Sequence, residues 1–146
     1  MIRVLIVDDH QLMREGIMAL LLKARDIHIV GEARDGQEAI DLAQRVNPDV
    51  ILMDIEMPRL NGLRAADQLK ALGHPARILM LSMKTEEKDV RAAARSGAQG
   101  FVVKNSSRDE LIGAIRSVYQ GKRVVSPSIA PFFSADSSGE DGRGVT

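Results

Sequence analysis

Five residues with charged or reactive side chains stand directly after short apolar runs. Asp8 and Asp9 follow the run RVLIV, and Asp54 follows DVILM. Ser82 follows RILML, and Lys104 follows GFVV. Apolar runs of this length are typical of strands that are covered on both faces of a parallel sheet. Because function in such a sheet gathers at the carboxyl ends of the strands, the five side chains are predicted to converge on one edge.

Three carboxylates that meet at one edge repel one another and resist ionisation unless a cation compensates them. Ligand sets of oxygen alone suit Mg²⁺, with Mn²⁺ as the alternative, and bound Mg²⁺ usually keeps waters for a phosphate-bearing partner. Lys104 could then serve an incoming anion. A carboxylate beside Mg²⁺, with a lysine and a hydroxyl to hold phosphoryl oxygens, is the equipment for phosphoryl transfer to aspartate.

Each of these residues also has a simpler explanation when it is taken alone. Asp8 or Asp9 could be the N-cap of the helix that follows. Ser82 could be an ordinary loop residue, and Lys104 a solvated surface charge. The joint placement of all five at predicted strand ends is what favours a functional site.

The elements that must position these residues alternate along the chain. Strands are predicted at residues 3–7, 27–33, 49–53, 77–81 and 100–103. Apolar stripes of helical period lie between them, for example Ala39, Ile40, Ala43 and Val46, and later Leu111, Ile112, Ile115, Val118 and Tyr119. The last helix opens on the capping-box pattern SRDE and ends before Gly121. The alternation predicts an α/β fold with a doubly wound, five-stranded parallel sheet and helices on both faces, as in flavodoxin-like proteins.

Composition limits the size and the partners of the protein. A chain of 146 residues with 45% hydrophobic residues can bury one core, so one domain is expected. With 20 basic and 20 acidic residues, it has no overall charge that would attract nucleic acid or a membrane surface. There are no cysteines, and the first apolar run is too short for a signal peptide, so the cytoplasm is the expected location.

The motifs VDDH (7–10), DIEMPRLNG (54–62), LS (81–82) and FVVK (101–104) together resemble the receiver domain of bacterial two-component response regulators. The resemblance covers about residues 2–122. It implies a phosphorylation-dependent signalling switch rather than an enzyme. Such a switch takes its phosphoryl group from a sensor histidine kinase. The DDH triplet and the segment GKRVVSPSIA are most similar to receivers that precede a LuxR-type helix-turn-helix domain.

The resemblance also implies a role for each residue. Asp54 is similar to the phospho-acceptor, Asp9 to a direct Mg²⁺ ligand and Asp8 to its partner that acts mainly through water. The backbone carbonyl of Glu56 would be a further ligand, and Lys104 would pair with the phosphoryl group. In the same family, Ser82 corresponds to the switch hydroxyl, and Phe101 to an aromatic residue that turns inward on activation. Phe101 could equally be a plain core aromatic.

The chain is expected to divide into a receiver domain, residues 1–125, and a linker or disordered tail, residues 126–146. The tail is rich in Ser, Gly, Pro and Asp. The ending GRGVT favours a chain cut at a domain boundary, so that DNA would be bound only by the missing output domain, and a stand-alone receiver is the alternative. Phosphorylation could also produce a homodimer, through the first and fifth helices or through the face formed by the fourth helix, fifth strand and fifth helix.

Two rival functions are less well supported by the sequence. An aspartyl-phosphate phosphatase needs a second aspartate two residues after its nucleophile, where this chain has Glu56. A flavin or nucleotide carrier needs a Gly- or Thr-rich phosphate loop after the first strand, where DDHQLM is acidic instead.

Two smaller expectations concern the loop after Asp54. An ion pair between Glu56 and Lys84 would cover the mouth of the site, and Gly62 would let the backbone pass close by.

Overall fold

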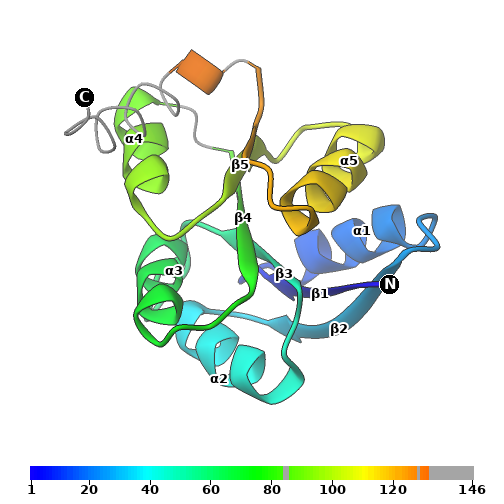
Figure 1. The fold of residues 1–146 in the computed structure, drawn as a ribbon, viewed down its shortest axis with the longest axis horizontal. Helices are drawn as coiled ribbons and strands as arrows, with labels where there is room; N and C mark the ends of the chain where they lie inside the picture. The colour runs from blue at the N-terminus through cyan, green and yellow to red at the C-terminus, as the bar shows by residue number, and fades with distance from the viewer. Residues whose placement is uncertain (84–85, 128, 132–146) are drawn as a thin grey trace.

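The computed structural model describes residues 1–83, 86–127 and 129–131, and it contains six strands and five helices (Figure 1). The strands are β1 Ile2–Val7, β2 Ile27–Ala33, β3 Val50–Asp54, β4 Arg77–Ser82, β5 Gly100–Val103 and β6 Val124–Val125. The helices are α1 Gln11–Leu21, α2 Gly36–Val46, α3 Gly62–Ala71, α4 Glu87–Arg95 and α5 Arg108–Tyr119. The predicted alternation of strand and helix is therefore confirmed.

All strands are parallel and lie in the order β2-β1-β3-β4-β5-β6. The order reverses direction between β1 and β3, and such a switch point opens a crevice at the carboxyl ends of the two strands. The register keeps neighbouring strand ends level, because Asp54 pairs with Leu81 and Ser82 pairs with Val103. The polar residues that follow these strands therefore meet at one edge.

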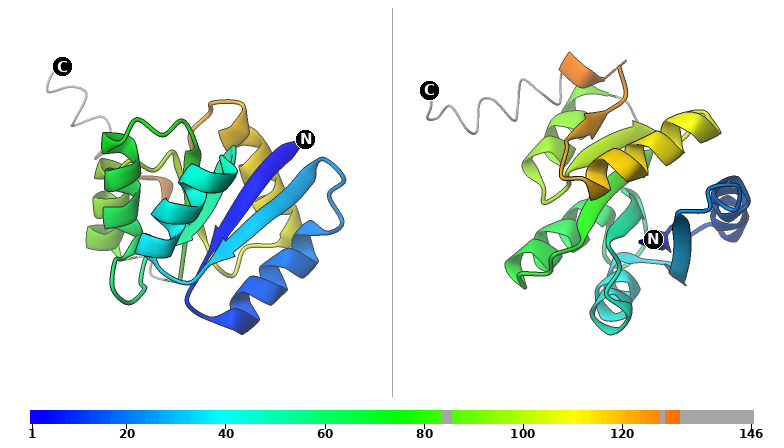
Figure 2. Two further views of the ribbon diagram at one scale, coloured as in Figure 1. Left: turned by 90° about the horizontal axis from the view of Figure 1, so that it is seen from below. Right: turned by 45° about the vertical axis from the view of Figure 1, so that its right-hand side comes forward.

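Helices cover both faces of the sheet (Figure 1 and Figure 2). The helices α1 and α5 lie on one face, and α2, α3 and α4 lie on the other. Alternate strand residues enter the two resulting cores: Leu5 and Val7 pack on the side of α2 to α4, and Val4 and Ile6 pack on the side of α1 and α5. Burial on both faces is why the strands are continuously apolar in the sequence.

The ends of several helices are fixed by their own side chains. Ser107 and Glu110 form the predicted capping box at the start of α5. Asp35 accepts a hydrogen bond from the Glu38 backbone N–H at the start of α2, and Asn61 does the same from Arg64 at the start of α3. These caps satisfy backbone donors that a helix leaves unpaired at its first turn.

The sheet has one strand more than the five predicted, because β6 pairs in parallel with the outer side of β5. Ser126 then donates its backbone N–H to the Phe101 carbonyl at 3.0 Å, and Ile129 is buried in the core. A pair of valines has no periodicity from which a strand could be predicted. A second difference concerns Tyr119, which the helical period predicts to be on the buried stripe of the last helix but which is 43% exposed.

Within the described ranges, no helix combines the length and hydropathy that a bilayer crossing requires.

Candidate functional site

An acidic cluster lies at the carboxyl ends of β1 and β3. Asp8 and Asp54 are buried, with 1% and 6% of their surfaces exposed, and Asp9 is partly exposed. One ligand atom from each of Asp8, Asp9, His10 and Asp54 can be chosen so that all four lie within 4.8 Å of one another. The three predicted aspartates are thus brought together, and His10 joins them.

Lys104 extends into this cluster from the end of β5. Its Nζ lies 2.8 Å from Asp8 Oδ2 and 3.3 Å from Asp54 Oδ1, and its side chain is buried. The Lys104 backbone N–H donates to the Ser82 carbonyl at 2.9 Å, which fixes the lysine relative to β4. Burial alone would lower the pKa of Lys104, but the hydrogen bond to Asp8 and the charge of Asp54 outweigh it and raise that pKa. The ammonium therefore stays charged between two carboxylates.

Asp54 has a strongly perturbed carboxyl group. Burial raises the pKa of Asp54 to about 6, Lys104 opposes that rise, and the charges of Asp8 and Asp9 add to it. One lysine therefore does not neutralise the three aspartates. A divalent cation would supply the missing positive charge and lower the pKa of Asp54.

The donors of the cluster fit a divalent cation. The Asp9 Oδ1 atom is buried and, within the described part of the chain, makes no hydrogen bond. The carboxylates of Asp8, Asp9 and Asp54 offer oxygen atoms at one point, which suits Mg²⁺. The His10 Nδ1 atom lies 3.1 Å from this acceptor without forming a hydrogen bond to it, and a metal ion would satisfy the acceptor.

The loop that follows Asp54 is held close to the strand. A Cβ atom on Gly62 would collide with the Asp54 carbonyl oxygen, which confirms that a glycine is needed where α3 begins. The Gly62 backbone N–H donates to the Ile55 carbonyl at 2.8 Å. Glu56, on this loop, is exposed directly beyond β3. Lys84 lies outside the described residues, so its predicted ion pair with Glu56 stays a prediction.

The same loop is fastened to the start of α2. The Gly36 backbone N–H donates to the Leu60 carbonyl at 2.8 Å, and Arg59 forms an ion pair with the buried Asp35. Burial alone would raise the pKa of Asp35, but hydrogen bonds from the Glu38 backbone N–H and from Arg59 outweigh it and lower that pKa. The loop beside the acidic cluster is therefore tied to a second element of the fold.

Ser82 and Phe101 occupy different depths. Ser82 is 3% exposed and ends β4, next to the strand that ends in Asp54. Phe101 is fully buried and lies opposite Met80 in the sheet, away from the edge. Ser82 thus belongs to the edge of the site, whereas Phe101 belongs to the core beneath it.

Arg14 is a site residue that the sequence analysis missed. It is 8% exposed, its Nη1 donates to the Asp8 carbonyl at 2.6 Å, and its Nε lies 3.0 Å from Glu32 Oε1. Arg14 shares the buried side of α1 with Ile17 and Leu21. The signal in the sequence was a charged residue, Arg14, at helical spacing from the apolar residues Ile17 and Leu21, which indicates a buried arginine.

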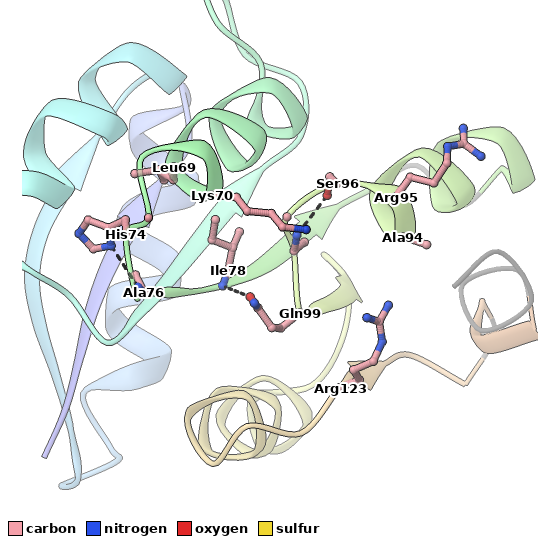
Figure 3. Close-up of a pocket in the computed structure, with 13 residues that line it drawn as sticks. Leu69, Lys70, His74, Ala76, Ile78, Ala94, Arg95, Ser96, Gln99 and Arg123 are labelled. Atoms are coloured by element: carbon pink, nitrogen blue, oxygen red, sulfur yellow. Dashed lines mark hydrogen bonds between the residues drawn. The ribbon is translucent and has the colours of Figure 1, made fainter. Parts of the chain in front are cut away.

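A separate cavity of about 490 Å³ lies at the opposite, amino edge of the sheet (Figure 3). Its lining includes Lys70 near the end of α3, Arg95 at the end of α4 and Arg123 before β6. Basic side chains at helix C-termini complement the helix dipole, which explains Lys70 and Arg95 without a ligand. The cavity shares no residue with the acidic cluster.

Comparison with known proteins gives consistent matches. A family model described as the response regulator receiver domain matches residues 4–116. The nitrate/nitrite response regulator protein NarL of Escherichia coli K12 is 36% identical over 132 residues, which are 90% of this chain and 61% of that protein. The transcriptional regulatory protein DegU of Brevibacillus brevis is 38% identical over 128 residues, which are 88% of this chain and 54% of that protein.

A solved structure agrees with both matches. A two-component response regulator of the LuxR family from Aurantimonas sp. SI85-9A1 superposes with a TM-score of 0.86 at 33% identity, over 92% of this chain and 96% of that one. The chain spans less than two thirds of the length of NarL and DegU. With the acidic cluster and Lys104 at the carboxyl edge of its sheet, the chain belongs to the response regulator receiver domain family, of the NarL and LuxR type.

Proposed function

We propose that this domain is a signalling switch in which Asp54 accepts a phosphoryl group from a sensor histidine kinase. The observation that supports it most directly is the position of the Lys104 Nζ, 2.8 Å from Asp8 and 3.3 Å from Asp54 at the switch point of the sheet. In the reaction a carboxylate oxygen of Asp54 forms a bond to phosphorus while the bond from phosphorus to the histidine nitrogen breaks. The ammonium of Lys104 would neutralise the charge on the transferred group.

The metal in this proposal is Mg²⁺, with Mn²⁺ as the alternative. Asp9 and Asp54 would ligate it directly, Asp8 mainly through water, and Glu56 through its backbone carbonyl. When bound, the ion would supply positive charge that keeps Asp54 ionised and stabilises phosphoryl oxygens. Arg14 holds the Asp8 backbone in place for this role.

Two further residues transmit the phosphorylated state. Ser82 would turn its hydroxyl toward a phosphoryl oxygen, and Phe101 would move inward as that space empties. Since Phe101 has no phenol oxygen, this coupling depends on packing. The response is a shift in population between two conformations, and it could include formation of a homodimer.

The rest of the proposal concerns the longer protein. NarL and DegU are named as a response regulator and a transcriptional regulatory protein, and this chain matches only part of each. We infer that residues 1–125 form the receiver and that residues 126–146, of which Ser126 and Ile129 still pack on the receiver, lead into a linker to a DNA-binding output domain. The switch would work in the cytoplasm and touch neither DNA nor membrane itself.

Acetyl phosphate with and without Mg²⁺, followed by intact mass, tests the central step. We expect one added phosphoryl group that requires Mg²⁺ and is absent from Asp54→Asn. The matched control is Asp67→Asn, which alters an exposed aspartate on α3 and should leave the adduct unchanged. An adduct that persists in Asp54→Asn, or no adduct on the wild-type protein, would refute the proposal.

A further inference from the structure

His10 lies against the acidic cluster, and the side-chain hydrogen bond that the structure gives its ring is the one between Nδ1 and Asp8 Oδ1. Its side chain is 72% exposed, so packing does not explain it. It stands at the N-cap position of α1, yet its side chain makes no capping hydrogen bond. What the ring does instead is face the two aspartates before it.

The contacts of the ring place a nitrogen atom beside the carboxylate oxygens that could hold a metal ion. His10 Nδ1 lies 3.1 Å from Asp9 Oδ1 and 3.3 Å from Asp8 Oδ1. Two donors that each bind one cation at about 2.1 Å are separated by about 3 to 4 Å, so these separations suit adjacent ligands. The Asp9 Oδ1 atom is the same buried acceptor that has no hydrogen bond within the described residues.

The backbone fixes the approach of this ring. The His10 backbone N–H donates to Asp8 Oδ1 at 2.9 Å, so Asp8 closes a tight turn over its own second neighbour. The turn keeps the His10 backbone beside the carboxylates, and Nδ1 faces them. When the proton is on Nε2, Nδ1 presents a lone pair toward them.

We propose that His10 is an additional ligand of the divalent cation and that it shifts the selectivity of the site from Mg²⁺ toward Mn²⁺. The inference rests on the proposed function, since it concerns the same metal site. Mg²⁺ favours oxygen ligands, whereas an imidazole nitrogen suits later first-row divalent ions, and affinity for nitrogen-containing sites rises along that series. Mn²⁺ accepts both oxygen and nitrogen ligands, so the His10 nitrogen should increase the affinity for Mn²⁺. The affinity for Mg²⁺ should depend on the carboxylates alone.

The test is pulsed electron paramagnetic resonance of bound Mn²⁺ on protein grown with ¹⁵N-labelled or unlabelled histidine. We expect nitrogen modulation of the Mn²⁺ signal that changes with the isotope and disappears in both His10→Ala and His10→Gln. His28→Ala is the matched control, because His28 is exposed on β2 near the amino ends of the strands. Modulation that is absent from the wild-type protein, or that survives in both His10 variants, would overturn the inference.

Equilibrium binding of both metals provides the second measurement. The ratio of Mn²⁺ to Mg²⁺ affinity should fall about tenfold in His10→Ala, in the range found when a supporting group of a metal site is removed. An unchanged ratio contradicts the inference. Phosphorylation of Asp54 with Mg²⁺ is measured in the same preparations: if it proceeds while the nitrogen signal is absent, only the role of His10 fails. If phosphorylation itself is absent, the proposed function fails.

Discussion

The substitution Asp54→Asn should stabilise the metal-free protein at neutral pH. The pKa of Asp54 is raised from its ordinary value of 3.8 to about 6 by burial, with Asp8 and Asp9 adding to the effect against Lys104. The folded state therefore keeps the Asp54 proton to a higher pH than the unfolded state does. As the pH rises through this interval, the ionised carboxylate costs the folded state free energy, and the wild-type protein loses stability. Asparagine cannot ionise and avoids the loss.

The magnitude follows from the same two values. The interval from 3.8 to about 6 corresponds to about 3 kcal/mol in the free energy of unfolding, reached above about pH 7. At pH 5 the folded state still holds most of its Asp54 protons, and the expected gain is about 1.5 kcal/mol. The gain of Asp54→Asn should therefore grow by about 1.5 kcal/mol between pH 5 and pH 7.5.

Urea unfolding in EDTA at several pH values measures this difference, with Asp67→Asn as the control for a surface aspartate. Saturating Mg²⁺ should remove the advantage of the variant, because the ion binds the wild-type carboxylate in the folded state only. A gain that is equal at pH 5 and pH 7.5, or a variant less stable than the wild type at both, would refute the reasoning about Asp54.

Three further changes have defined outcomes. Lys104→Met removes the charge that lowers the pKa of Asp54, so that pKa should rise above about 6 in a carbon NMR titration. Phosphorylation by acetyl phosphate should also slow more than about tenfold. The control variant Lys70→Met should change neither quantity. Gly36→Ala brings a Cβ atom against the Leu60 carbonyl oxygen and should lower the free energy of unfolding in urea by about 1 to 3 kcal/mol. In the control variant Gly113→Ala, nothing lies within 4 Å of the new Cβ atom in α5, so this change should be neutral or stabilising. Arg14→Lys should lower the free energy of unfolding by about 1 to 2 kcal/mol, because one ammonium cannot replace both the hydrogen bond to the Asp8 carbonyl and the ion pair with Glu32. An unchanged urea midpoint would show that these contacts contribute little to stability.

The strands β1 to β5 and the three aspartates of the acidic cluster were predictable because both follow from short-range patterns in the sequence. A strand buried on two faces is continuously apolar, so its end is visible in the sequence as the first polar residue. In a parallel sheet all such ends share an edge, which is why the sequence predicts that Asp8, Asp54 and Lys104 lie together, as they do.

The parts that could not be predicted depend on partners far away in the sequence. Lys104 was expected to await an anion, but in this structure its Nζ is paired with Asp8 and Asp54, because their charges are the nearest available. The ion pair between Asp35 and Arg59 joins two loops that no local pattern connects. Ile129 is buried although its surroundings are rich in Ser and Pro, because burial is decided by the core it meets rather than by its neighbours in sequence.

The pairing of β6 with β5 determines how the chain leaves the domain. Ser126 donates its backbone N–H to the Phe101 carbonyl at 3.0 Å and accepts a hydrogen bond from the Val103 N–H at 3.2 Å through its hydroxyl. Ile129 is buried in the same core cluster as Phe101. A displacement of β5 must either move residues 124–126 with it or break these bonds. Residues 124–126 are therefore coupled directly to the strand that contains Phe101, and a movement of that strand would reach them without a separate contact surface.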